Sequence, residues 1–268
     1  MKIQGRTVVV TGGASGIGKA LCEAFAEAGA RNVVVADVDT AGAAAVARTI
    51  QGHAVGCDVS RREEIEALLM LTESDIGPVD IFCSNAGVAI GFDNSFANAA
   101  AAADGVWERA WAINVMAHVH AARILVPLMK ARGGGAFVHT ISAAGLLNQV
   151  GSAVYGTTKH AAIGFAENLA ITHRDDGIEV YALCPQGVDT PMLRGLPAGP
   201  QSMGGVLTAR EVAAATLAAI QERRFLVLPH PDVARYMQRK AADYDRWLEG
   251  MARPQRSIRQ AGDQENPA

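Results

Sequence analysis

Short runs of β-branched and aliphatic residues alternate along this chain with longer segments in which apolar residues recur every three or four positions. The short runs predict buried strands, and the longer segments predict amphipathic helices. Strands that alternate with single helices are typical of an α/β domain built on a parallel sheet. The predicted strands are residues 7–10, 32–36, 53–57, 79–83, 136–141, 178–184 and 225–228.

Helices are predicted between most of these strands, at residues 19–28, 61–72, 106–130, 209–221 and 231–250 and in the segment after Tyr155. Residues 88–105 are rich in Ala, Asn and Gly and predict a loop with one short helix. From residue 251 the chain is polar, which predicts a disordered tail. We therefore expect one domain over residues 1–250 and a tail over residues 251–268.

The composition fits one large buried core, since 50% of the 268 residues are hydrophobic and 19% are charged. A net charge of −3 and a pI of about 6.2 provide no basic surface for nucleic acid or an anionic membrane. No apolar run approaches a membrane span and the N-terminus lacks a signal-peptide core, so we expect a cytoplasmic protein. The cysteines and histidines lack ligand spacing, so we predict no metal site and no disulfide.

A glycine-rich turn, T-G-G-A-S-G-I-G over residues 11–18, joins the first predicted strand to the first helix. Backbone N–H groups and the positive end of the helix dipole can hold a pyrophosphate there, and glycines let it approach closely. The spacing G-x-x-x-G-x-G differs from the commoner G-x-G-x-x-G, so the turn alone is weak evidence. The residues expected at the phosphates are Gly12, Ser15, Gly16, Ile17 and Gly18.

An acidic residue, Asp37, ends the second predicted strand about twenty residues beyond the glycines. A carboxylate there can accept hydrogen bonds from both hydroxyls of an adenosine ribose and repels a 2′-phosphate, which favours NAD over NADP. No Arg or Lys follows it that would neutralise such a phosphate. The alternative is a surface turn residue that precedes a helix N-cap at Asp39 or Thr40.

Further polar residues follow the next two strands, with Asp58 and Val59 after the third and Asn85, Ala86 and Gly87 after the fourth. The carboxyl ends of parallel strands share one edge of a sheet, where a ligand is expected. Asn114 stands inside a predicted helix, where asparagine lowers helix propensity. Solvent exposure or a role in a proton relay would each explain it.

A possible acid/base pair lies in the stretch from Ser142 to Lys159. Tyr155 and Lys159 are four residues apart on a predicted helix, so both side chains project from one face. A cation close to a phenol favours the phenolate and moves its pKa toward the working pH. Ser142 follows the fifth strand and can face this helix. Taken alone, the Tyr-x-x-x-Lys spacing is more often a chance spacing on an exposed helix.

Taken together, these motifs resemble the short-chain dehydrogenase/reductase family, single-domain branch, over residues 4–228. The resemblance rests on the T-G-x-x-x-G-x-G turn, Asp58, the N-A-G of residues 85–87, Asn114, Ser142, Tyr155 and Lys159, in the family's order and approximate spacing. It implies a Rossmann-type, doubly wound, seven-stranded parallel sheet with helices on both faces. It also implies hydride transfer between a nicotinamide and an alcohol or carbonyl, and a homotetramer with Ala-rich helix faces (Ala117, Ala121, Ala161, Ala162) at one interface. The same alanines could instead simply pack on the sheet.

The family pattern assigns roles to the matched residues. Tyr155 is implied as the general acid/base, Ser142 as a hydrogen-bond donor to the substrate oxygen, and Lys159 as the cation that lowers the pKa of Tyr155 and binds the nicotinamide ribose. Asn114 is implied to place a water that links Lys159 to solvent. The implied NAD site comprises the glycine turn, Asp37, Asp58, Val59, residues 85–87, Tyr155, Lys159, Val188 and Thr190.

Two positions depart from the family pattern. Ser84 replaces the first asparagine of N-N-A-G, a mild change, and Gln186 replaces the glycine of P-G-x-V-x-T. A glutamine there must turn outward or project into the substrate pocket, where an amide would need a polar partner. The segment after Thr190 is rich in Gly, Pro and Met and predicts a mobile flap or a disordered loop. Its apolar residues Met192, Leu193 and Leu196 are expected to line the substrate pocket.

The sequence thus predicts an NAD-dependent oxidoreductase that interconverts a secondary alcohol and a ketone, on a hydrophobic (aryl, alicyclic or steroid-like) small molecule. One alternative is NADPH-dependent reduction of carrier-protein-bound 3-oxoacyl groups, which Asp37 disfavours. Another is an NAD-binding sensor that has lost the reaction, against which every catalytic position is retained. The substrate itself is not encoded in these motifs.

Overall fold

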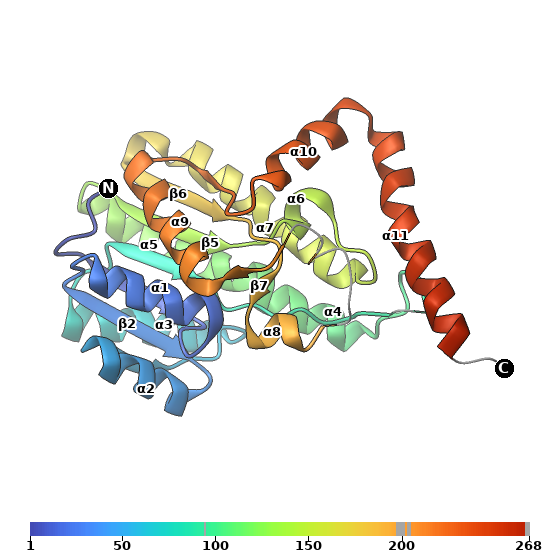
Figure 1. The fold of residues 1–268 in the computed structure, drawn as a ribbon. Coiled ribbons are helices and arrows are strands. Elements are labelled where there is room, and N and C mark those ends of the chain that lie inside the picture. The colour runs from blue at the N-terminus through green and yellow to red at the C-terminus, as the bar shows by residue number, and fades with distance from the viewer. Residues whose placement is uncertain (94, 197–201, 203–204, 266–268) are drawn as a thin grey trace.

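The computed structural model describes residues 1–93, 95–196, 202 and 205–265. A parallel sheet of seven strands in the order β3-β2-β1-β4-β5-β6-β9 forms its centre (Figure 1). The sheet confirms the predicted fold class, and all seven predicted strands are present. They are β1 (Thr7–Thr11), β2 (Asn32–Asp37), β3 (His53–Gly56), β4 (Ile81–Ser84), β5 (Gly135–Thr140), β6 (Ile178–Leu183) and β9 (Leu226–Val227).

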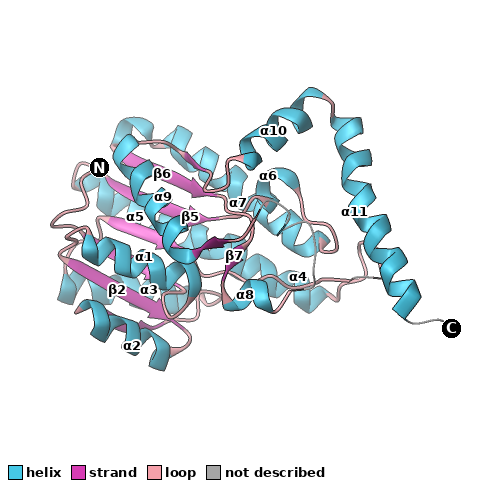
Figure 2. Ribbon diagram, in the orientation of Figure 1, coloured by secondary structure: helices cyan, strands magenta, loops and turns pink. Residues whose placement is uncertain are grey.

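Helices cover both faces of the sheet (Figure 2) because successive strand residues point to opposite sides. Val8 and Val10 of β1 pack with helices α1 (Gly16–Glu27), α2 (Thr40–Ile50) and α9 (Ala209–Glu222). Val9 packs with helices α3 (Arg62–Leu71), α5 (Ala117–Ala131) and α7 (Ala153–Thr172) on the other face. Three shorter helices are α4 (Asp104–Trp111), α6 (Ala144–Leu147) and α8 (Pro191–Arg194). The helical turns are the π-helical η1 (Thr72–Ile76) and η2 (Ala112–Met116) and the 3₁₀ turn η3 (Arg174–Asp176). Two short strands that were not predicted, β7 (Val188–Asp189) and β8 (Leu207–Thr208), pair with each other.

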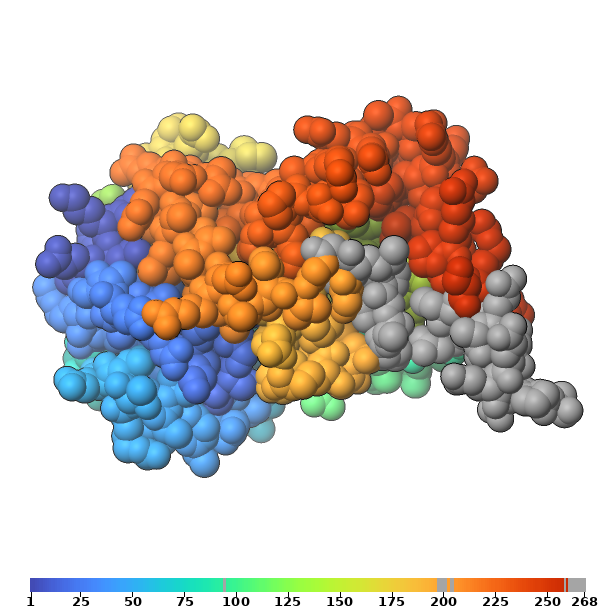
Figure 3. All heavy atoms as spheres, in the orientation of Figure 1, coloured from blue at the N-terminus to red at the C-terminus, as the bar shows by residue number. Residues whose placement is uncertain are grey.

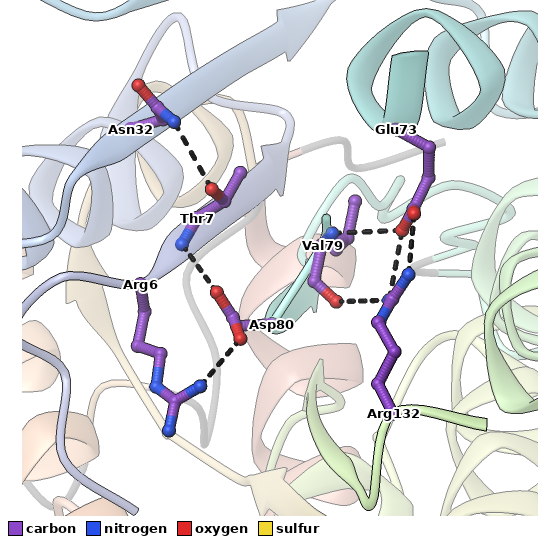
Figure 4. A network of polar contacts seen from close by, with 7 residues as sticks. All are labelled: Arg6, Thr7, Asn32, Glu73, Val79, Asp80 and Arg132. Atoms are coloured by element: carbon purple, nitrogen blue, oxygen red, sulfur yellow. Dashed lines mark hydrogen bonds and ion pairs between the residues drawn. The ribbon is translucent and has the colours of Figure 1, made fainter. Parts of the chain in front are cut away.

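A polar network ties the amino ends of neighbouring strands together (Figure 4). Asp80, which precedes β4, accepts hydrogen bonds from the Thr7 amide at 2.9 Å and from Arg6 at 2.8 Å. Asn32, the first residue of β2, donates to the Thr7 hydroxyl at 3.2 Å. Nearby, Arg132 forms an ion pair with Glu73, which also accepts from the Val79 amide. With its side chains paired in this way, this edge of the sheet is structural, and the opposite edge carries the candidate chemistry.

The C-terminal segment differs from the expected single helix and disordered tail. It forms two helices, α10 (Asp232–Ala242) and α11 (Tyr244–Glu265), which stand at the end of the molecule away from α2 (Figure 3). Val233, Tyr236 and Trp247 pack into a small apolar cluster with Leu147. This contact anchors the two helices, and α11 continues through residues 251–265, for which we expected disorder.

Two further expectations require correction. Three of the four alanines expected at a subunit interface (Ala117, Ala121 and Ala162) are buried in the core against the sheet. The continuous helical segment Asp104–Ala131 contains an 18-residue window with a mean hydropathy of 1.3, which is long and apolar enough to cross a membrane by length and composition, so the expectation that no segment approaches a span was too strong. Half of that apolar window is buried inside the fold, as a helix packed on a sheet requires.

Candidate active site

The glycine turn leaves the N-terminus of α1 open. Gly12 and Gly16 have φ angles of +67° and +52°, which favour glycine. A Cβ on Gly12 would lie 2.9 Å from the Ala86 Cα, so no side chain fits between these two loops. Ser15 precedes the helix without capping it through its side chain, and no acidic residue lies in the first turn. Free N–H groups at a helix N-terminus are the arrangement that binds a phosphate.

Asp37 faces this turn. Its Oδ2 accepts a hydrogen bond from the Ala14 amide at 3.0 Å, and its Oδ1 accepts from the Asp39 amide at 3.0 Å. Asp39 is the N-cap of α2, as the alternative interpretation of this segment proposed, and accepts from the Gly42 amide at 2.9 Å. Asp37 is nevertheless no ordinary surface turn residue, because its carboxylate lies against the loop expected to hold the phosphates.

Residues that follow β3 and β4 complete the same edge. Asp58 accepts hydrogen bonds from the Ser60 amide and hydroxyl, which fix its carboxylate. Asn85 donates to the Thr11 carbonyl at 2.9 Å and accepts from the Thr140 hydroxyl at 3.0 Å. It therefore connects the carboxyl ends of β1, β4 and β5, and it does so where the strand order reverses between β1 and β4. Open α/β sheets bind ligands at such a switch point.

Asn114 lies in the π-helical turn η2 and is fully buried. Its amide accepts from the Val88 N–H and donates to the Val88 carbonyl, both at 2.9 Å, and also donates to the Thr158 hydroxyl at 3.1 Å. A π-turn inside a helix is often found at a functional site. The solvent exposure that would have explained Asn114 is therefore wrong, and its observed contacts hold the loop after β4 against α7.

Lys159 and Tyr155 project from α7 beneath that loop. The Lys159 ammonium is buried, donates to the Thr140 carbonyl at 3.2 Å, and lies 5.6 Å from the centre of the Tyr155 ring. A Cβ on Gly87 would lie 3.3 Å from the Asn114 Oδ1 and 3.4 Å from the Lys159 Nζ. Asn114, Lys159 and Gly87 therefore surround one small space at the floor of the cleft.

Burial sets the ionisation of both α7 groups. It lowers the pKa of Lys159 from 10.5 to about 8. It also raises the pKa of Tyr155, and the hydrogen bond from Ser142 acts in the opposite direction. The expected lowering by Lys159 is not found, because the ammonium lies over the ring face and is held by the Thr140 carbonyl. The Ser142 hydroxyl is the group that lowers the phenol pKa in this structure.

Two hollows meet at these side chains. A cleft of about 570 Å³ runs along the carboxyl ends of the strands, and a second cavity of about 720 Å³ lies beside it. Ser142, Tyr155, Gln186, Val188 and Met192 line both. All the residues predicted for the cofactor line the first cleft, namely Gly12, Ser15, Gly16, Ile17, Gly18, Asp37, Asp58, Val59, Asn85, Ala86, Gly87, Tyr155, Lys159, Val188 and Thr190. The residues predicted for the substrate, Gln186, Met192, Leu193 and Leu196, line the second.

Gln186 sits at the junction of the two hollows. Its Oε1 is buried and has no hydrogen-bond partner among the described residues. The His230 Nδ1 accepts a hydrogen bond from the backbone N–H of Gln186, and the His230 Nε2 lies 3.1 Å from the Gly187 carbonyl. This histidine therefore fixes the backbone of residues 185–187, where the sequence differs from the family pattern. Of the two placements considered for the Gln186 side chain, the structure shows the inward one, toward the substrate cavity. Residues 197–201 and 203–204 of the flap predicted after it lie outside the described residues.

Several lining residues gave no signal in the sequence. Arg109 of α4 is exposed and lines the cofactor cleft, and His230 supports Gln186 from 44 residues away. Arg239, Arg246 and Trp247 bring α10 and α11 into the wall of the second cavity. Within the described ranges, no cluster of three or more His, Cys, Asp or Glu residues could hold a metal ion.

The chain matches known proteins over most of its length. A family model described as short chain dehydrogenase matches residues 6–201. A 1-deoxy-11-beta-hydroxypentalenate dehydrogenase from Streptomyces exfoliatus is 37% identical over 247 residues, which cover 87% of this chain and 86% of that protein. A 3beta-hydroxysteroid dehydrogenase 2 from Eggerthella lenta is 34% identical over 194 residues, 70% of this chain and 73% of that protein.

Solved structures agree. A short chain dehydrogenase/reductase from Burkholderia phymatum in complex with NAD superimposes with a TM-score of 0.80 at 28% identity and covers 91% of this chain and 96% of that chain. Structures of similar chains hold either NAD or NADPH. The comparisons therefore agree with the site in pointing to a nicotinamide cofactor, and they do not decide between its two forms.

Proposed function

The chain belongs to the short chain dehydrogenase family, and from this premise we propose that it is an NAD-dependent enzyme that interconverts a secondary alcohol and a ketone. The observation that carries the proposal is the meeting of the two hollows at Ser142 and Tyr155. One hollow has the phosphate-binding turn and the other has apolar walls. The two hydroxyls at their junction would lie beside both the cofactor and the substrate, which hydride transfer requires to be close together.

The residues present fit a nicotinamide dinucleotide. The uncapped N-terminus of α1 and the side-chain-free space at Gly12 would hold the pyrophosphate, and Asp58 and Asn85 to Gly87 lie beside it. When bound, the nicotinamide would supply the hydride acceptor or donor. Asp37 would accept hydrogen bonds from the adenosine ribose, and its charge would oppose a 2′-phosphate.

The chain's own residues would move the proton. In oxidation the Tyr155 phenolate takes the alcohol proton while Ser142 donates a hydrogen bond to the same substrate oxygen, and in reduction the Tyr155 phenol returns the proton. Lys159 lies at the floor of the cleft beside Gly87, where its ammonium would bind the nicotinamide ribose. The NH₂ group of Asn114 is used by Val88 and Thr158, which holds the loop that carries Gly87, while its Oδ1 accepts one hydrogen bond and keeps a second acceptor site that would place a water beside Lys159.

The substrate is proposed to be a hydrophobic small molecule. Leu147, Val188, Leu193, Leu196 and Trp247 give the second cavity apolar walls, and its volume of about 720 Å³ lies in the range of small-molecule sites. Related chains are dehydrogenases of a hydroxypentalenate and of hydroxysteroids. An aryl, alicyclic or steroid-like secondary alcohol fits this space.

The assay follows NADH absorbance with purified protein and a panel of secondary alcohols, with NAD and NADP compared in parallel. We expect oxidation of bulky apolar alcohols with a preference for NAD. Activity confined to NADPH and carrier-bound 3-oxoacyl groups would support the reductase alternative. Tight NADH binding without turnover of any alcohol or ketone would indicate a sensor.

We also propose a homotetramer. The buried alanines do not supply the interface, but Trp111, Leu128 and Ile171 on α4, α5 and α7 are large apolar residues with exposed fractions of 42%, 38% and 76%. Light scattering is expected to give four times the mass of the chain, and a monomer at micromolar concentration would contradict the proposal.

A further inference from the structure

The second cavity has a charged wall that the proposed reaction does not use. Helices α10 and α11 close one side of the cavity, and Arg239 and Arg246 line it from the last turn of α10 and the first turn of α11. Neither arginine lines the cofactor cleft. Their charge therefore faces the space for the substrate and is separate from the site that would hold the cofactor.

Both guanidinium groups are free to bind a ligand. Within the described residues, neither side chain forms an ion pair or a hydrogen bond. Neighbouring cations on the same helix are used differently: Arg235 pairs with Asp232 at 3.0 Å, and Lys240 donates to the Leu146 carbonyl at 2.8 Å. Asp243 shares the cavity wall and accepts from the Arg246 amide at 3.0 Å. Two arginines and one aspartate give this wall a net charge of about +1 at neutral pH.

We infer that the substrate is a hydroxy or keto carboxylic acid, whose carboxylate Arg239 and Arg246 bind while its carbinol carbon lies at Ser142 and Tyr155. A guanidinium offers two parallel N–H donors that match a carboxylate. The single net positive charge suits one carboxylate better than a doubly charged phosphate. The apolar residues that line the same cavity favour a hydrophobic body, which would separate the reacting carbon from the acid group.

This inference rests on the proposed alcohol–ketone reaction and adds the acid group to it. The orphan Oε1 of Gln186 lies at the reacting end, where a donor on the substrate would satisfy it. Because both arginines are exposed to solvent, water and salt screen their charges, and their contribution to binding is modest. Removing both charges is therefore expected to reduce kcat/KM for the acid by about tenfold.

The experiment compares hydroxy acids with their uncharged esters. Lithocholate and 4-hydroxycyclohexanecarboxylate, each with its methyl ester, are oxidised by the wild type, by the double variant Arg239→Gln/Arg246→Gln and by Arg253→Gln. Arg253 is the matched control, because it is an exposed arginine of α11 that lines neither hollow. Neutral secondary alcohols are assayed beside them to measure the basal reaction.

The inference predicts that the wild type prefers at least one acid to its ester. The double variant is expected to lose about tenfold in kcat/KM for that acid and little for the ester, and Arg253→Gln is expected to keep the preference. Oxidation of neutral alcohols or esters without an acid preference, or with a preference that the double variant retains, would overturn the inference and leave the proposed function intact. Failure to oxidise any alcohol with either cofactor would overturn both.

Discussion

Lys159→Met is expected to stabilise the protein at pH 7 while it impairs the reaction. Burial lowers the pKa of Lys159 from 10.5 to about 8. Since one pKa unit corresponds to about 1.4 kcal/mol, the buried ammonium costs the folded state roughly 3 kcal/mol at neutral pH. Methionine fills similar space without the charge. The variant also loses the hydrogen bond to the Thr140 carbonyl, which lowers its free energy of unfolding by about 1 kcal/mol. The net increase in the free energy of unfolding is therefore about 2 kcal/mol.

The pH dependence identifies the cause. The folded pKa lies below the unfolded value, so between about pH 8 and pH 10.5 the unfolded chain binds more protons than the folded chain. Wild-type stability from this group therefore rises with pH through that window. The advantage of Lys159→Met is expected to be present at pH 7 and absent above pH 10.5.

Urea unfolding of both proteins at several pH values measures this difference. Lys240→Met is the matched control, because Lys240 also donates to a backbone carbonyl but is only half-buried. The control is expected to show no comparable gain at neutral pH. A Lys159→Met variant that is less stable than wild type at pH 7, or a difference that does not change between pH 7 and pH 10.5, would refute the reasoning.

Three other predictions follow from the site. Asp37→Ala is expected to weaken NAD binding and improve kcat/KM for NADP by relieving repulsion of the 2′-phosphate; equal use of both cofactors by the wild type would contradict this role. Gln186→Gly is expected to change the ranking of kcat/KM across an alcohol panel with little effect on the NADH dissociation constant; an unchanged ranking would contradict substrate selection. Alcohol oxidation is expected to rise with pH as Tyr155 ionises, and Ser142→Ala is expected to move the inflection to higher pH, because Ser142 lowers the pKa of Tyr155; an inflection that does not move would count against that contact.

The cofactor side of the site was predictable because its residues follow strands. A short apolar run marks each strand, and parallel strands place their carboxyl ends at one edge, so Gly12, Asp37, Asp58 and Asn85 could be brought together from the sequence. The structure places all of them around one cleft. Tyr155 and Lys159 followed from helical spacing in the same way.

The substrate side depends on contacts that no local pattern records. The amphipathic pattern of residues 231–250 showed a helix but neither its break at Asp243 nor the position of α11, which the cluster of Val233, Tyr236 and Trp247 sets. The sequence pattern consequently gave no sign that Arg239 and Arg246 line a cavity.

Buried polar pairs were likewise beyond the sequence. His118 and His139 meet in the core with their Nδ1 atoms 2.9 Å apart, although they belong to different elements. Burial lowers the pKa of both, to about 3 for His139, so the pair is neutral at physiological pH. The π-turn at Asn114 was equally hidden, because the partner of Asn114, Val88, lies 26 residues earlier in a loop.

The central claim is that Tyr155 transfers the proton at the junction of the cofactor cleft and the substrate cavity. The most direct test measures kcat for alcohol oxidation and the NADH dissociation constant for Tyr155→Phe. Because only the transferable proton is removed, kcat is expected to fall by about 10² to 10⁴-fold while NADH affinity is largely unchanged. A variant that keeps more than about a hundredth of wild-type kcat would contradict the claim.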